Sequence, residues 1–358
     1  MFNDIESKLN SISEGGSLDR ETLAAILSTE DGASKNILYR YADKTRAAHM
    51  GDGITLRGIV EFSNVCAGTC VYCGLNRYNT KLKRYDLESE RILASVAELA
   101  AHKIKTVVLQ SGENHTFDGI WFGELISEIK DKFGIRITLS VGEKPYDVIK
   151  HWKDKGADRY LLKIETSNKN FYDYLHPGMS FENRLRTLKD LKELGYQVGS
   201  GIIVGLFGQT TKMLADDIIF LKENDFDMVA IGPFIPHVNT DCAGHRAGSA
   251  EMTLKTLALA RVVTKNAHMP STTALGVIDS ETKIKALSSG ANVIMVNFTP
   301  ERVKDLYSIY DGKSAGSGKF SNYSMEKMAA GIKRHIDYSE GDSLKAPGVE
   351  RVDTIVKR

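Results

Sequence analysis

The chain has 358 residues, of which 42% are hydrophobic, and its 47 lysines and arginines balance 46 aspartates and glutamates to a net charge of +1. That apolar fraction suffices for a large core and excludes disorder as the main state, while the near-neutral charge argues against a protein that coats nucleic acid. The apolar run at residues 202–207 is far shorter than the ~20 residues of a membrane helix, and the N-terminus lacks the basic and apolar stretches of a secretory signal. We therefore expect a soluble cytoplasmic protein with neither a membrane nor a nucleic-acid partner.

Residues 1 to about 50 show a helical pattern, since residues 17–21 resemble a helix start and apolar residues recur after it at helical spacing. From residue 54 onward, short β-rich apolar runs alternate with amphipathic helical stretches. The eight predicted strands cover residues 54–64, 106–111, 135–141, 159–165, 197–206, 228–236, 271–276 and 292–297, and the helical patterns between them include residues 88–101, 181–194, 213–223 and 254–264.

This regular alternation predicts an α/β fold with parallel strands and helical crossovers. Eight such units most simply close into a complete (β/α)8 barrel of the TIM type, whereas a doubly wound open sheet would be unusually long. We expect a helical extension over residues 1–50, the barrel over residues 51–310, and a Gly/Ser/Lys-rich loop, a short helix near residues 324–334 and a charged tail within residues 311–358. The N-terminal helices are expected to cover the bottom of the barrel, and the C-terminal tail to approach its top.

Residues with reactive or polar side chains follow the predicted strands. In a barrel of this type, functional residues come from the C-terminal ends of several strands, which meet at one rim. At these ends lie Cys66, Cys70, Cys73, Ser111, Gly112, Glu113, Thr138, Ser140, Glu165, Thr166, His237, Thr272, Thr273 and Asn297.

Three of the four cysteines form a C-x3-C-x2-C motif at Cys66, Cys70 and Cys73, whereas Cys242 stands alone and is not expected to be a ligand. Two disulfides are not expected in a chain of this size without a secretory signal. Thiolates are the usual ligands of iron–sulfur clusters, and three on one loop would leave one iron of a four-iron cluster open. A structural zinc ion usually takes four closed ligands. A zinc site completed by a distant histidine and simply buried cysteines are the alternatives to a cluster.

At this motif the sequence resembles the radical S-adenosylmethionine (SAM) enzymes. The resemblance implies a 4Fe-4S cluster on Cys66, Cys70 and Cys73, whose open iron binds the amino and carboxylate groups of SAM. It also implies reductive cleavage of SAM to methionine and a 5′-deoxyadenosyl radical, which acts on a small substrate inside the barrel. Tyr72, directly before the last cysteine, matches the aromatic residue that the family places against the adenine.

Several further blocks resemble the HydE family, the radical SAM maturases of FeFe-hydrogenase. These blocks are residues 61–66, 70–75, 108–113, 156–162, 180–185, 227–237 and 290–295, and the resemblance covers roughly residues 20–312. Biotin synthase and methylornithine synthase share the cysteine spacing and the barrel but match the other blocks less well. The HydE resemblance implies a small iron complex with CO, cyanide and cysteine as substrate, an electron donor such as flavodoxin or ferredoxin, and contacts with other hydrogenase maturases.

The resemblance also assigns individual residues. Gly112 and Glu113 match the motif that receives the SAM amino group, Glu165 matches the acid that binds the ribose, and Arg184 matches the residue that pairs with the SAM carboxylate, a role that suits a planar fork of donors. Ser111, Ser140, Gly205 and Leu206 are further residues assigned to SAM, and Thr138, Arg159, Thr272, Thr273, Met295, Tyr307 and Tyr310 are assigned to the substrate cavity.

Each assignment has a structural alternative. Glu113 could cap a helix, Glu165 could pair with Lys163, and Arg184 could be a surface cation. The two threonines could complete hydrogen bonds of the barrel, and Met295 could pack in the core.

The chain departs from the HydE family at two places. Residues 163–166 read Lys-Ile-Glu-Thr where the family has Arg-His-Glu-Thr, and residues 313–325 lack the cysteines that hold an accessory cluster in some members. Because side chains alternate along a strand, we expect Lys163 and Glu165 on one face and Ile164 packed outward. A cation inside the barrel needs an anionic partner, so we expect Lys163 to receive a substrate carboxylate. The alternative functions are a methylornithine synthase-like mutase or lyase on an amino-acid-derived substrate, and a non-enzymatic metal or iron–sulfur assembly scaffold.

Overall fold

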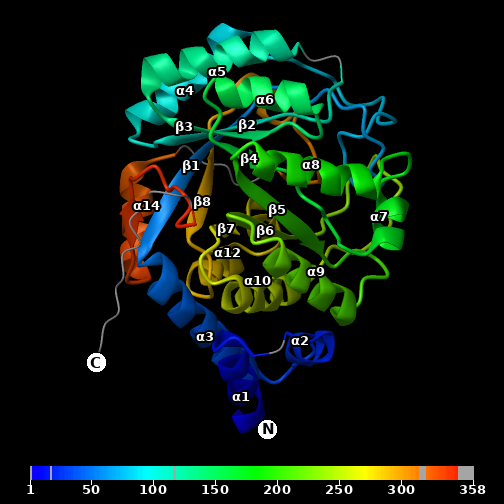
Figure 1. The fold of residues 1–358 in the computed structure, drawn as a ribbon, viewed down its shortest axis with the longest axis vertical. Coiled ribbons are helices and arrows are strands. Elements are labelled where there is room, and N and C mark those ends of the chain that lie inside the picture. Colours follow the sequence, from blue (N-terminus) through cyan, green and yellow to red (C-terminus); the bar gives the residue numbers. More distant parts are fainter. Residues whose placement is uncertain (1, 17, 116–117, 314–319, 346–358) are drawn as a thin grey trace.

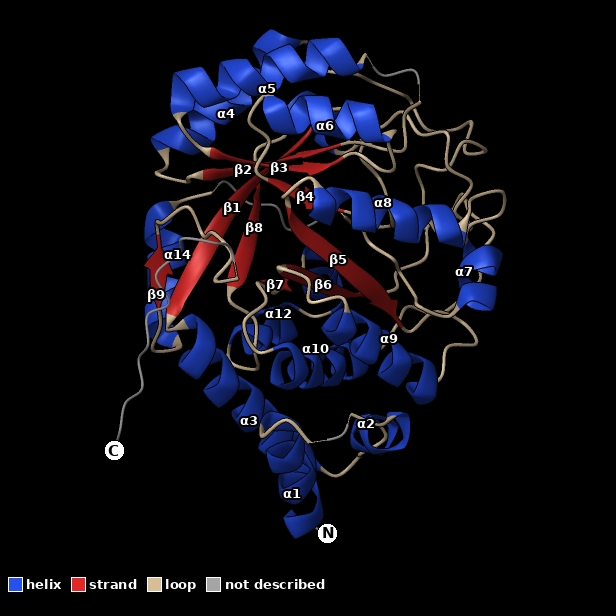
Figure 2. Ribbon diagram, viewed as in Figure 1, coloured by secondary structure: helices blue, strands red, loops and turns tan. Residues whose placement is uncertain are grey.

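Eight parallel strands form a nearly closed barrel at the centre of the protein (Figures 1 and 2). The computed structural model describes residues 2–16, 18–115, 118–313 and 320–345. The strands are β1 (Gly53–Glu61), β2 (Thr106–Gln110), β3 (Arg136–Ser140), β4 (Arg159–Leu161), β5 (Gln197–Val204), β6 (Met228–Pro233), β7 (Pro270–Ser271) and β8 (Val293–Asn297). They are hydrogen-bonded in the order β6-β5-β4-β3-β2-β1-β8-β7. A parallel bridge between Met228 and His268 spans the remaining gap between β6 and β7. The predicted (β/α)8 barrel is confirmed.

Helices surround the strands and bury the apolar outer face of the sheet. They are α4 (Ser89–Ala101), α5 (Gly119–Phe133), α6 (Tyr146–Asp154), α7 (Lys169–Leu175), α8 (Phe181–Glu193), α9 (Thr211–Glu223), α10 (Ala250–Thr264), α11 (Thr273–Ile278), α12 (Ser280–Leu287), α13 (Glu301–Lys304) and α14 (Asn322–Gly331). Along β3, Ile137 and Leu139 point into this hydrophobic core. The alternate residues Arg136, Thr138 and Ser140 therefore face the barrel interior. None of the helices within the described ranges has the length and apolar character that a membrane span requires.

Three helices precede the barrel: α1 (Phe2–Ser13), α2 (Arg20–Leu27) and α3 (Gly32–Met50). Asp19 and Asp31 start α2 and α3, because each carboxylate accepts a backbone N–H of the first turn at 2.8 Å. Figure 1 shows these helices beside α9 and α10, and their contacts are with these two outer helices. The expectation that they cover the bottom of the barrel is therefore wrong.

Two predicted strands end early. β7 has only two residues, since the chain turns into α11 at Thr272, whose hydroxyl accepts the N–H of Leu275. Thr272 and Thr273 thus lie at a helix start and not within a strand. β4 ends at Leu161, and the chain beyond it rejoins the sheet through a bridge at Glu165, which has a left-handed backbone (φ 63°).

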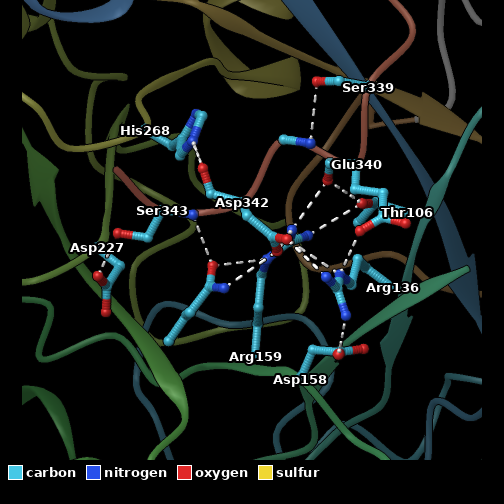
Figure 3. Close-up of polar contacts among 12 residues, drawn as sticks. Thr106, Arg136, Asp158, Arg159, Asp227, His268, Ser339, Glu340, Asp342 and Ser343 are labelled. Carbon is cyan, nitrogen blue, oxygen red and sulfur yellow. Dashed lines mark hydrogen bonds and ion pairs between the residues drawn. The ribbon is translucent and has the colours of Figure 1, made fainter. Parts of the chain in front are cut away.

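The described C-terminal residues lie at the bottom of the barrel, so the expectation that the tail approaches the top is wrong for them. β9 (His335–Asp337) pairs in parallel with the first residues of β1. The next stretch, residues 339–343, is here called the floor segment. It lies across the N-terminal ends of the strands, where it bonds to residues of β2, β3, β4 and β5 (Figure 3). Residues 314–319 and 346–358 of the predicted loop and tail lie outside the described residues.

Asp342 is the centre of the floor. Its carboxylate accepts hydrogen bonds from Arg159 at 2.6 Å, from Arg136 at 2.8 Å and from Gln197 at 3.0 Å. Arg159 is fully buried at the first position of β4 and also binds Thr106 and the Glu340 carbonyl. The structure therefore does not support the expectation that Arg159 contacts substrate. Its guanidinium is already bound at the end of the barrel opposite the cysteines.

Asp342→Ala should lower the free energy of unfolding by roughly 3–5 kcal/mol, because Arg159 would stay buried without its counter-ion. Urea unfolding followed by circular dichroism measures this change. Asp154→Ala is the control, since Asp154 forms an exposed pair with Lys150 that contributes less than ~1 kcal/mol. Equal effects of the two substitutions would show that the floor pair does not stabilise the barrel.

Candidate active site

The three motif cysteines lie close together on the loop that follows β1. A Cβ atom on Gly68 would lie 3.2 Å from the Cys66 Sγ and 3.8 Å from the Cys70 Sγ, so Gly68 lies against both thiols. The backbone N–H groups of Gly68 and Glu113 each donate to the Cys66 Sγ at 3.3 Å. Burial raises the pKa of all three thiols, that of Cys70 to about 12. The free thiols are therefore protonated, and metal binding must release their protons.

Arg84 holds this loop in place from within. Its guanidinium donates to the backbone carbonyls of Asn64, Leu75 and Asn76 at 2.7–2.8 Å. These carbonyls lie before and after the cysteines, so one side chain fixes both ends of the motif. Arg84 was not identified from the sequence, because it lies outside the cysteine motif and belongs to no recognisable motif itself.

The donor set fits an iron–sulfur cluster better than zinc. Within the described residues, no three His, Cys, Asp or Glu side chains, the motif cysteines included, lie close enough together to hold one metal ion. The neighbouring histidines are already bonded, His176 to Tyr72 and His237 to Ser308. Cys242 is outside the motif and is buried in an apolar cluster with Leu206 and Phe234. Three thiols without a fourth protein ligand are what a cluster with one open iron needs.

Glu113 connects the end of β2 to the cysteine loop. A Cβ atom on the preceding Gly112 would lie 2.4 Å from the Val65 carbonyl oxygen, so glycine is required for this close approach. The Glu113 carboxylate accepts the N–H of Glu143 at 2.7 Å, and burial raises the pKa of Glu113 to about 7. Ser111 and Ser140 lie next to it, joined by a backbone hydrogen bond of 3.1 Å.

Arg184 is buried in the first turns of α8, which excludes the alternative that it is a surface cation. Its Nε donates to Glu143 at 2.5 Å and its Nη1 donates to the Lys163 carbonyl. Burial alone would lower the pKa of Arg184, but Tyr172 and Glu143 outweigh it and raise the pKa. The guanidinium therefore remains a fixed positive charge.

Glu165 and Lys163 form an ion pair of 2.7 Å, while Ile164 is fully buried in the hydrophobic core. The backbone of Glu165 is held by β5, since its N–H donates to Gly201 and its carbonyl accepts from Ile203. A left-handed backbone is costly for a residue other than glycine, and such residues cluster at functional sites.

An apolar wall lies beside the last two cysteines. Leu175, Ile203, Leu206, Phe234 and Cys242 form this buried cluster, and Val71 and Tyr72 pack on it. Gly205 has φ 89° and lies so close to Gly248 that a Cβ atom would be 2.4 Å from that residue's Cα. An apolar wall of this kind, with the aromatic ring of Tyr72 packed on it, is suited to contact with a planar base.

The remaining predicted residues lie around the barrel interior. Thr138 is buried and its hydroxyl has no partner among the described residues, which marks an orphaned polar atom inside the barrel. Met295 shares the inner face of β8 with Asn297, since Ile294 and Val296 belong to the outer core. Thr272 is half-buried, whereas Thr273 is exposed.

Residues 306–313, here called the upper segment, run over the C-terminal rim and carry Tyr307 and Tyr310. The Ile309 carbonyl accepts the N–H of Gly74, and the Asp311 N–H donates to Pro236. Lys313 ends the segment and pairs with Glu61, which is buried at the end of β1. This pair was also missed, although the place of Glu61 at a strand end is a signal that could have found it.

Comparison with known proteins supports these features. Residues 60–221 match the profile of the Radical SAM superfamily. The chain is 46% identical to the [FeFe] hydrogenase maturase subunit HydE of Thermotoga maritima over 82% of this chain and 84% of that protein. It is 27% identical to 3-methylornithine synthase of Methanosarcina acetivorans over 97% and 95% of the two chains.

Solved structures agree on the fold. The crystal structure of methylornithine synthase (PylB) has a TM-score of 0.83 at 24% identity and covers 94% of this chain and 98% of its own. The maturase HydG has a TM-score of 0.80 at 18% identity and covers 95% and 77%. At these identities the likeness concerns the fold alone. The identity to HydE over most of both chains decides the family: the chain is a radical SAM enzyme of the HydE family, which uses a 4Fe-4S cluster and SAM.

Proposed function

We propose that the protein is a HydE-type maturase that acts on a small substrate during assembly of the active site of FeFe-hydrogenase. The observation that carries this proposal is the 46% identity to HydE, against 27% to methylornithine synthase. When bound, the 4Fe-4S cluster supplies the electron that cleaves SAM to methionine and a 5′-deoxyadenosyl radical. The electron would come from a small donor such as flavodoxin or ferredoxin in the cytoplasm, and the product would pass to other hydrogenase maturases.

The chain's own residues hold and orient the two cofactors. Cys66, Cys70 and Cys73 would hold the cluster, and the bonded loop around them would keep the three thiols in place. Glu113 receives the SAM amino group together with Ser111 and Gly112. The described contacts of Arg184 use Nε and Nη1. Its Nη2 is the donor that we assign to the SAM carboxylate.

Glu165 is assigned to the SAM ribose, next to Ser140, and the adenine is assigned to the apolar wall between Tyr72, Gly205 and Leu206. The substrate is assigned to the barrel interior, lined by Thr138, Thr272, Thr273, Met295, Tyr307 and Tyr310. The upper segment and the floor segment close the two ends of the barrel. A closed interior keeps water away from a reactive intermediate.

A maturation mixture with the other maturases and an inactive FeFe-hydrogenase tests the proposed function. We expect hydrogenase activity to appear when this protein and SAM are supplied without another HydE. SAM cleavage that yields methylornithine instead, with no hydrogenase activity, would establish the alternative enzyme. A scaffold would activate nothing and release no 5′-deoxyadenosine.

Anaerobically reconstituted protein should bind roughly four irons per chain. Cys66→Ser, Cys70→Ser and Cys73→Ser should each lose the cluster, because no fourth protein ligand can compensate. Cys242→Ser should keep it, since Cys242 is outside the motif and is buried among apolar residues such as Leu206 and Phe234. Iron analysis and electron paramagnetic resonance measure both outcomes. Loss of iron in Cys242→Ser, or bound zinc without iron, would refute this ligand assignment.

Arg184→Ala and Glu165→Ala should each weaken SAM binding more than tenfold while the cluster stays intact. The loss of one charge-assisted hydrogen bond costs ~1.5–3 kcal/mol. Calorimetric titration of the reconstituted protein with SAM measures the effect. Lys189→Ala is the matched control, because Lys189 lies on the same helix in an exposed pair with Glu193. If Arg184→Ala binds SAM with unchanged affinity, Arg184 has only a structural role.

Lys163→Met should abolish hydrogenase maturation but leave SAM binding and uncoupled 5′-deoxyadenosine formation largely intact. We assign Lys163 to a carboxylate of the substrate, an anion that would replace or share its present partner Glu165. Lys169→Met is the control, since Lys169 is an exposed cation on α7. If Lys163→Met matures hydrogenase normally, Lys163 is only the structural partner of Glu165.

A further inference from the structure

Three consecutive residues at the end of α7 each bind the cysteine loop. The Leu175 carbonyl accepts the N–H of Val71 at 3.0 Å, and the Pro177 carbonyl accepts the hydroxyl of Thr69. Between them, the imidazole Nε2 of His176 lies 3.0 Å from the hydroxyl of Tyr72. The end of α7 is therefore attached to the loop on both sides of Cys70.

The other ring nitrogen of His176 decides which tautomer is present. Nδ1 lies 2.9 Å from the backbone carbonyl of Tyr172, one turn earlier in α7. A carbonyl oxygen only accepts, so Nδ1 must carry the proton and donate it. Nε2 is then the bare nitrogen and can only accept, which makes the Tyr72 hydroxyl the donor.

The surroundings keep this imidazole neutral. His176 is 1% exposed, and its ring stacks on Tyr172 with centroids 4.2 Å apart. The guanidinium of Arg184 lies over the ring of Tyr172, 5.8 Å from its centroid. Burial, aided by the charge of Arg184, lowers the pKa of His176 to about 3. The ring is therefore neutral near pH 7, and its Nε2 is an acceptor.

The Tyr72 ring has two further constraints. It meets His176 edge-on, with centroids 5.6 Å apart and planes at 90°, and it packs on the apolar cluster that contains Leu206. The apolar contacts allow the ring to slide, whereas a hydrogen bond at the hydroxyl fixes its direction.

We propose that His176 is a positioning residue, whose bare Nε2 holds the hydroxyl of Tyr72 and thereby fixes the ring against which the adenine of SAM packs. This rests on the proposed function, because it needs SAM at this site. The aromatic contacts from His176 through Tyr172 to Arg184 also join the adenine end of the site to its carboxylate end.

The test uses the cluster-loaded protein and measures SAM affinity by calorimetry. His176→Phe keeps a flat ring but removes the acceptor, and Tyr72→Phe removes the donor. Each should weaken SAM binding about three- to tenfold, the effect of one neutral hydrogen bond. The double variant should bind SAM no more weakly than the weaker single one, because both changes break the same bond. His176→Gln should recover most of the affinity, since its side-chain amide can place an acceptor near the lost Nε2.

His102→Phe is the matched control, because His102 also loses one hydrogen bond, to Asn322, on a distant part of the barrel. Iron content and the cluster spectrum without SAM should be unchanged in all variants. Additive losses in the double variant, no recovery by His176→Gln, or unchanged affinity in His176→Phe would each overturn the positioning role. If His176→Phe loses its cluster, Tyr72→Phe and His176→Gln still test the proposal. A Tyr72→Phe variant that binds SAM as tightly as the wild type refutes it.

These outcomes differ from a failure of the proposed function. A wild-type protein that binds no SAM would refute SAM chemistry at this site altogether. A wild-type protein that binds SAM and responds to His176 as expected, yet matures no hydrogenase, would refute only the HydE role.

Discussion

The chemistry of this protein depends on the rigidity of the loop that carries Cys66, Cys70 and Cys73. Closely spaced cysteines form a metal site only if surrounding contacts hold the three thiols in position before the metal binds. Arg84 fixes both ends of the loop through three carbonyls. The end of β2 contributes an N–H to Cys66, and the end of α7 attaches the residues around Cys70. The loop is thus held from within, from the sheet and from the outer helices.

Charge burial is the second constraint on the fold. Arg159 with Asp342, Glu61 with Lys313 and Arg184 with Glu143 are all largely withdrawn from solvent. A buried charge without its partner would destabilise the fold by several kcal/mol. Each pair therefore holds the two segments that carry its residues next to each other. The first pair holds the bottom of the barrel and the second holds its top. Each end of the barrel therefore has a buried ion pair with one partner from the C-terminal part of the chain.

The same rim explains how one family can host several reactions. The residues assigned to the cluster and to SAM lie at the end of β3, on the segments that follow β1, β2, β4 and β5, and on α8, and these five strands are neighbours in the barrel. The residues assigned to the substrate lie farther inside and on the upper segment. Lys163, next to Glu165, stands where the family has an arginine, so a planar fork of donors is exchanged for a single ammonium group while the cysteine loop is untouched.

The sequence by itself determined the alternation of strands and helices, the barrel, the cysteine motif and the strand-end residues around it. These features are local, because each depends on periodicity or spacing within a few residues. It also predicted that Lys163 and Glu165 share a side, since alternation is a local property, and the two do form an ion pair. The early end of β7 was missed because the capping hydroxyl of Thr272 competes with a strand pattern in the same residues.

Only the tertiary structure decided which distant segments meet. Arg159 and Asp342 are 183 residues apart in the sequence, and Tyr72 and His176 are 104 apart. The sequence around Arg159 does not indicate at which end of the barrel its guanidinium lies. The sequence of residues 339–343 does not indicate that this segment lies across the N-terminal ends of the strands. The partner of a buried charge or a buried imidazole is set by the packing of the whole barrel, and a pattern within one segment does not contain that information.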